Sequence, residues 1–103
     1  MTGTASQIEW AEQIRPRVDA EFARVAAAFR SAASKQQGPD RIDTAEVIEI
    51  LEQKRREVMA QDRAGYFIRN WQEMTDQVRR MILADSRYQT IKANRTARSR
   101  GAN

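Results

Sequence analysis

Apolar residues recur every three or four positions through several long segments of the chain, which is the period of an amphipathic α-helix. The first segment is the longest, and its apolar positions are Ile8, Ala11, Ile14, Val18, Phe22, Val25 and Phe29. Ser6 and Glu9 have the spacing of a capping box, in which each side chain bonds the backbone amide of the other residue. This pattern predicts a helix over residues 6–33.

Pro16 falls inside this predicted helix. A proline within a helix removes one backbone hydrogen bond, and its ring crowds the carbonyl four residues earlier, here that of Glu12. The apolar positions nevertheless keep their phase on both sides of the proline. This continuity predicts one kinked helix and not two separate helices.

A loop marked by Gly38-Pro39 separates the first segment from a second amphipathic one. Asp43 and Glu46 resemble a capping box with aspartate in place of serine or threonine. The pattern that follows predicts a second helix over residues 44–61.

The third predicted helix spans residues 66–84, and its apolar face consists of Phe67, Trp71, Met74, Val78, Met81 and Ile82. Ser86 and Gln89 then have the spacing of another cap, which predicts a short fourth helix. From Asn94 onward alanine is the one apolar residue type, so burial in a core cannot hold this segment. We therefore expect a single helical domain over residues 1–93 and a flexible basic tail over residues 94–103.

These elements predict an all-α fold, an antiparallel bundle of three main helices with a short fourth. A length of 103 residues suits one small domain. With 4 glycines and 2 prolines, the chain has too few turn residues for a β-sandwich.

The predicted helices differ in length, and this difference suggests self-association. The first would be ~42 Å long and the second and third each under ~30 Å, at about 1.5 Å per residue. One end of the long apolar face is then exposed in a monomer, and an exposed apolar patch of this kind is typical of a protein–protein interface. The expected contact residues are Trp10 and Ile14 at one end and Phe22 and Phe29 at the other. Tyr88 and Ile91 of the fourth helix are the competitors for the same surface.

The composition removes most catalytic chemistry. The chain has no cysteine and no histidine, so it lacks thiolate nucleophiles, imidazole bases and the usual zinc ligands. Its scattered glycines form no phosphate-binding loop. The carboxylates of the first helix lie on its polar faces, where charged groups normally face water. We expect no enzyme activity, no metal and no cofactor.

Charge is distributed unevenly, with the basic excess at the C-terminal end. The net charge is +4, made of −2 over residues 1–51 and +6 over residues 52–103, and no acidic residue follows Asp85. Cations in such a tail can contact phosphates, which favours nucleic-acid binding as an alternative function. The candidate contacts are Lys92, Arg95, Arg98 and Arg100. The simpler interpretation is a solubilising tail.

Three of the seven aromatic residues lie within six positions, at Tyr66, Phe67 and Trp71. The favoured interpretation makes them core anchors of the bundle. The other interpretation is an exposed aromatic patch that stacks on a base or a peptide.

Residues 6–15 (SQIEWAEQIR) are similar to a K-Q-I-x-W-A-x-x-I-R opening, and residues 64–70 (AGYFIRN) are similar to a later A-x-W-W-I-D-x-R segment. Through these two segments the chain resembles small helical proteins from bacteria, phages and mobile gene cassettes. Here Tyr66-Phe67 stand for the tryptophan pair, and Arg69 stands where the acid would be. That group has no assigned activity. The resemblance implies that Trp10 and the segment 66–68 lie close together.

The sequence therefore predicts a non-enzymatic helical protein that self-associates through protein–protein contacts. The alternative is a nucleic-acid-binding accessory protein, and a more distant one is a bundle that binds a small ligand. No segment is apolar enough to span a membrane, and residues 1–10 do not resemble a secretory signal, so we expect a cytoplasmic location without membrane contact.

Overall fold

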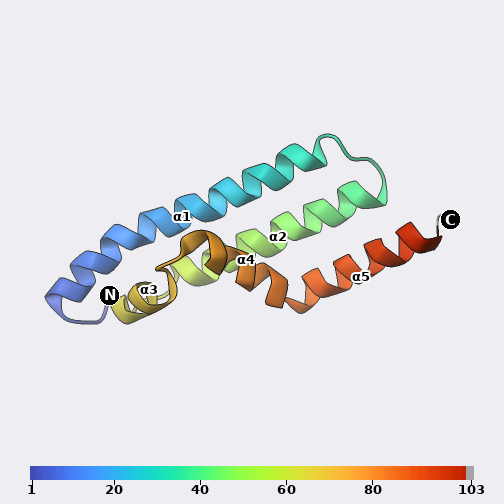
Figure 1. The fold of residues 1–103 in the computed structure, drawn as a ribbon. Coiled ribbons are helices and arrows are strands. Elements are labelled where there is room, and N and C mark those ends of the chain that lie inside the picture. Colours follow the sequence, from blue (N-terminus) through green and yellow to red (C-terminus); the bar gives the residue numbers. More distant parts are fainter. Residues whose placement is uncertain (102–103) are drawn as a thin grey trace.

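The computed structural model describes residues 1–101 and contains five helices in that range (Figure 1). They are α1 (Ala5–Ala33), α2 (Pro39–Met59), α3 (Ala64–Asn70), α4 (Met74–Ala84) and α5 (Ser86–Gly101). The helices α1 and α2 form a long antiparallel pair, and α3, α4 and α5 return along it (Figure 1). The predicted all-α fold is confirmed, in an elongated body of 59 × 23 × 19 Å.

Helix α1 continues through Pro16 without interruption, as the phase of its apolar positions predicted. Its capping box lies two residues earlier than expected. The Gln7 backbone amide donates to Thr4 Oγ1 at 3.2 Å, and the Thr4 amide donates to Gln7 Oε1 at 3.0 Å. Ser6 is therefore inside the helix and does not cap it.

Helix α2 begins earlier than the predicted cap at Asp43. Gly38 adopts a left-handed backbone conformation with φ +62°, and Pro39 is the first helical residue. Proline suits this position because its φ is already helical and it has no amide to leave unpaired. Thr44, predicted at the start of the helix, is buried and donates to the Asp40 carbonyl at 3.0 Å.

The single helix predicted over residues 66–84 is wrong, because it breaks between α3 and α4. At the break, side-chain amides of Asn70 and Gln72 donate to carbonyls of α3. Asn70 Nδ2 donates to the Tyr66 carbonyl at 2.9 Å, and Gln72 Nε2 donates to the Ile68 carbonyl at 3.2 Å. The break lets α3 pack against α1, while α4 contacts both α1 and α2.

The flexible tail predicted from Asn94 is also corrected, because α5 is helical through Gly101. Residues 102–103 of that prediction lie outside the described residues. Ile91 is buried near the middle of α5, and Arg95 and Arg98 form ion pairs with acidic side chains of α2. Ion pairs with distant parts of the sequence thus hold the C-terminal half of α5 in place, where hydrophobic burial alone would not.

The core is centred on two aromatic side chains, Phe22 of α1 and Trp71 at the end of α3. Each is 1% exposed, and their ring centroids lie 5.6 Å apart. Phe67 is also fully buried, so the interpretation of these aromatics as core anchors holds for Phe67 and Trp71. The buried Trp71 Nε1 has no acceptor among the described residues.

Within residues 1–101, no helix is both long enough and apolar enough to cross a lipid bilayer.

Because the indole nitrogen of Trp71 is unpaired, we predict that replacement of Trp71 by phenylalanine destabilises the fold only slightly. A buried donor without a partner costs about 1–3 kcal/mol, which Trp71→Phe removes together with part of the side-chain volume. Trp71→Ala leaves a large cavity and is expected to cost about 3–5 kcal/mol. We expect Trp71→Phe to lower the free energy of unfolding by less than half as much as Trp71→Ala does, measured by urea unfolding followed by circular dichroism. Equal losses for the two variants would show that the indole nitrogen makes a stabilising bond.

Candidate interaction site

An apolar groove lies between the C-terminal half of α1 and the helices α4 and α5. Its volume is about 390 Å³, and the apolar side chains that line it are Val25, Phe29, Val78, Ile82, Leu83 and Tyr88. The groove exists because α5 packs on α2 and α4 and does not close onto α1. Leu83 is 36% exposed at its edge.

The rim of the apolar groove is positively charged. Arg79 of α4 and Lys92 of α5 both line it and are exposed. Neither forms an ion pair with another residue of the described chain. The site therefore combines an apolar floor with two free cations.

A second hollow of about 250 Å³ continues the apolar groove toward α2. It shares Phe29, Tyr88 and Lys92 with the first and adds Val47 and Ile91 at its base. The open space thus extends along α5 and includes Phe29, one of the four α1 residues expected to be uncovered.

Asp85 fixes the start of α5, and therefore one wall of the apolar groove. Its carboxylate accepts bonds from the Arg87 backbone amide at 2.8 Å and from the Arg87 guanidinium at 2.9 Å, and Lys54 of α2 lies at 3.2 Å. Asp85 rather than the predicted Ser86 thus supplies the cap. The Arg87 guanidinium is the main cause that holds the pKa of Asp85 far below its ordinary value, and Lys54 adds to this.

The far end of α5 is held by a second group of ion pairs. Arg98 pairs with Asp40 at 3.4 Å and also with Asp43, both in α2. Arg95 lies 3.9 Å from Asp40. These contacts keep α5 along α2 beyond the point where Ile91 is buried.

The four expected self-association residues occupy different environments. Phe22 is in the core, so it is not available to a partner, because it packs against Trp71. Phe29 is half-buried in the apolar groove, and Ile14 is half-buried against the core. Trp10 is 53% exposed, near the opposite end of α1.

The four candidate nucleic-acid contacts are divided as well. Arg95 and Arg98 pair with acidic side chains of α2, whereas Lys92 and Arg100 line an exposed hollow on α5 without an ion pair in the described chain. Two of the four cations are thus already partly neutralised.

Tyr66 is half-buried, with its ring edge against Phe67 at 5.2 Å between centroids. With Phe67 and Trp71 buried, the three aromatics do not form an exposed patch together.

Sequence reasoning missed Val78, Ile82, Leu83 and Tyr88 as parts of one site. The sequence did contain a signal for Leu83. It follows Met81 and Ile82 but lies outside the apolar stripe of its helix, which indicates an exposed apolar side chain. The direction in which α5 leaves Asp85 was not readable from local pattern.

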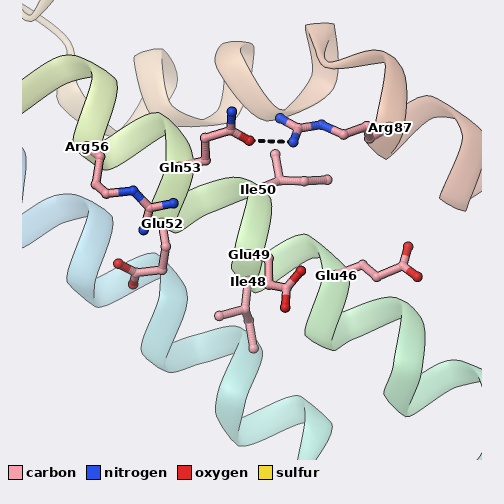
Figure 2. Close-up of a pocket in the computed structure, with 8 residues that line it drawn as sticks. All are labelled: Glu46, Ile48, Glu49, Ile50, Glu52, Gln53, Arg56 and Arg87. Carbon is pink, nitrogen blue, oxygen red and sulfur yellow. Dashed lines mark hydrogen bonds between the residues drawn. The ribbon is translucent and has the colours of Figure 1, made fainter.

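A larger hollow of about 640 Å³ lies on the outer face of α2 and has a charged lining (Figure 2). Figure 2 shows Glu46 and Glu49 extending from α2, and Arg87 donating a hydrogen bond to Gln53 Oε1. Within residues 1–101, no cluster of three acidic side chains is arranged to hold a metal ion. This hollow is open to solvent and lined mainly by charged and polar side chains.

Comparisons with known proteins give no further assignment: no family model, curated protein or solved structure matches this chain. The resemblance of residues 6–15 and 64–70 to small bacterial and phage proteins therefore stays a prediction.

The low pKa of Asp85 predicts acid-sensitive stability. A carboxyl group with a lower pKa in the folded state stabilises the protein above its unfolded pKa, and this contribution is lost as the pH falls toward the folded value. The free energy of unfolding should thus fall below about pH 4, the ordinary range of aspartate. In Asp85→Asn this part of the decline should be absent, and the variant should be less stable at pH 7. Urea unfolding at several pH values measures both effects, and parallel pH curves for the two proteins would contradict the assignment.

Proposed function

We propose that this protein is a non-enzymatic interaction module that associates with a second copy of itself through the apolar groove. The observation that carries the proposal is the open apolar lining between α1, α4 and α5. Apolar surface gathered in one concave place, with a polar rim, is typical of interaction sites.

The position of α5 supports this proposal. The fourth helix was the competitor for covering α1, since Tyr88 and Ile91 had the right spacing. Ile91 packs toward α2, and Tyr88 remains half-buried at the edge of the apolar groove. Helix α5 thus adds a wall to the site and leaves the floor accessible.

Size and symmetry favour a dimer of identical chains. A domain of about 100 residues buries a limited part of its surface alone, so burial in an interface adds to its stability. A twofold pair is the commonest closed arrangement of identical chains. Nucleic-acid binding ranks below this function because Arg95 and Arg98 are paired with Asp40 and Asp43.

The proposal is tested by the oligomeric state of three proteins at several concentrations. We expect the native chain to be a dimer in light scattering. Leu83→Asp places a charge at the edge of the apolar groove and should weaken the dimer roughly 10- to 100-fold, as expected for an unpaired polar group in an interface.

Ile42→Asp is the matched control, because Ile42 is 61% exposed on α2 and does not line the apolar groove. This variant should dimerise like the native chain. A native chain that stays monomeric at several hundred micromolar would overturn the proposed function, and a dimer unaffected by Leu83→Asp would place the interface elsewhere.

A further inference from the structure

We propose that the C-terminal half of α5 binds the phosphate backbone of duplex DNA, and that Asp40 and Asp43 of α2 restrain this binding. The inference goes beyond the proposed self-association and does not depend on it. It rests on two free cations on the outward side of α5 and on two further cations that carboxylates of α2 already hold.

Lys92 and Arg100 lie on the outward side of α5. They are eight positions apart, which is about 12 Å along a helix, and Thr96 midway between them shares their side. All three line an exposed hollow of about 400 Å³ on this helix. Neither cation forms an ion pair within residues 1–101. Both can therefore take an anion without giving up an internal partner.

Among the described residues, no carboxylate lines this exposed hollow. The other residues around it are Gln89, Ala93 and Ala97, all of them neutral. Asp85 is the last acidic residue of the sequence. A phosphate at this place thus meets cations and neutral side chains, an arrangement that attracts a polyanion through salt-sensitive contacts.

The side chains of this segment favour duplex DNA over other polyanionic partners. A helix that binds a membrane surface carries large apolar side chains opposite its cations, but alanine is the one apolar residue type after Ile91. Single-stranded nucleic acids stack their bases on aromatic side chains, and no aromatic residue follows Tyr88. Cations without such groups suit a duplex, whose phosphates are exposed and closely spaced.

Asp40 and Asp43 hold the other two cations of this segment. Arg98 lies 3.4 Å from Asp40 and also pairs with Asp43. Arg95 lies 3.9 Å from Asp40. The side chains of Arg98 and Arg95 are nevertheless 39% and 44% exposed, so a phosphate can reach them. Because it must compete there with carboxylates of α2, the two aspartates lower the affinity of the native chain for a phosphate backbone.

The ion pairs that restrain this segment are exchangeable. Ile91 is the last buried residue within residues 86–100, so the ion pairs of Arg95 and Arg98 hold the part beyond it on α2. Exposed ion pairs contribute little to stability and are screened by salt. A row of phosphates can thus replace the aspartates, which adds Arg95 and Arg98 to the contacts that Lys92 and Arg100 make.

The first experiment measures the binding of a fluorescein-labelled duplex DNA by anisotropy at several salt concentrations. Lys92→Gln with Arg100→Gln should weaken the binding roughly tenfold and reduce the salt slope by up to about 0.9 for each lost contact. The matched control is Arg17→Gln with Arg56→Gln, since these arginines are exposed and unpaired within residues 1–101 but lie on α1 and α2. The control removes the same charge and should have a much smaller effect.

The second experiment removes the restraint. Asp40→Asn with Asp43→Asn should tighten the binding roughly tenfold and steepen the salt slope, as two additional phosphate contacts would. The matched control is Glu9→Gln with Glu12→Gln, which neutralises two exposed acids at the opposite end of the molecule from the C-terminal half of α5 (Figure 1). No gain in affinity, or an equal gain in the control, would overturn the restraint.

Three results would overturn the DNA site itself. The first is no binding at low salt by either the native chain or Asp40→Asn with Asp43→Asn. The second is undiminished binding by Lys92→Gln with Arg100→Gln. The third is tighter binding to vesicles that contain phosphatidylserine than to the duplex, measured by cosedimentation. None of these results bears on dimerisation through the apolar groove, which light scattering measures separately.

Discussion

The direction of α5 depends on one carboxylate, and the apolar groove depends on that direction. Asp85 ends α4, caps α5 and pairs with Lys54 of α2, so the chain turns onto α2 at this point. The ion pairs of Arg98 with Asp40 and Asp43 hold the other end of α5 on the same helix. With both ends tied to α2, α5 cannot also cover α1, and the space between them stays open.

Much of the fold was readable from periodicity, because burial of an apolar stripe produces a local pattern. Helix α1 and most of α2 followed from it, as did the core positions of Phe67 and Trp71, whereas Phe22, expected at an interface, lies in the core. The start of α2 was misplaced because two start signals compete there, and Pro39 determined the first helical residue.

The remaining errors have nonlocal or side-chain causes. The break after α3 is accompanied by side-chain bonds from Asn70 and Gln72 to carbonyls of α3, which no apolar pattern reveals. The helical C-terminal segment depends on ion pairs between Arg98 and residues more than fifty positions away. For the candidate site, Phe29 could be named from the sequence, whereas the part built by α4 and α5 needed the tertiary arrangement.

The central claim is that a second copy of the chain covers the apolar groove. The most direct measurement is photo-cross-linking from a benzophenone amino acid placed at Leu83, with the cross-linked peptides identified by mass spectrometry. The account predicts intermolecular cross-links from this position to another copy of the chain. Cross-links confined to the same chain would contradict it.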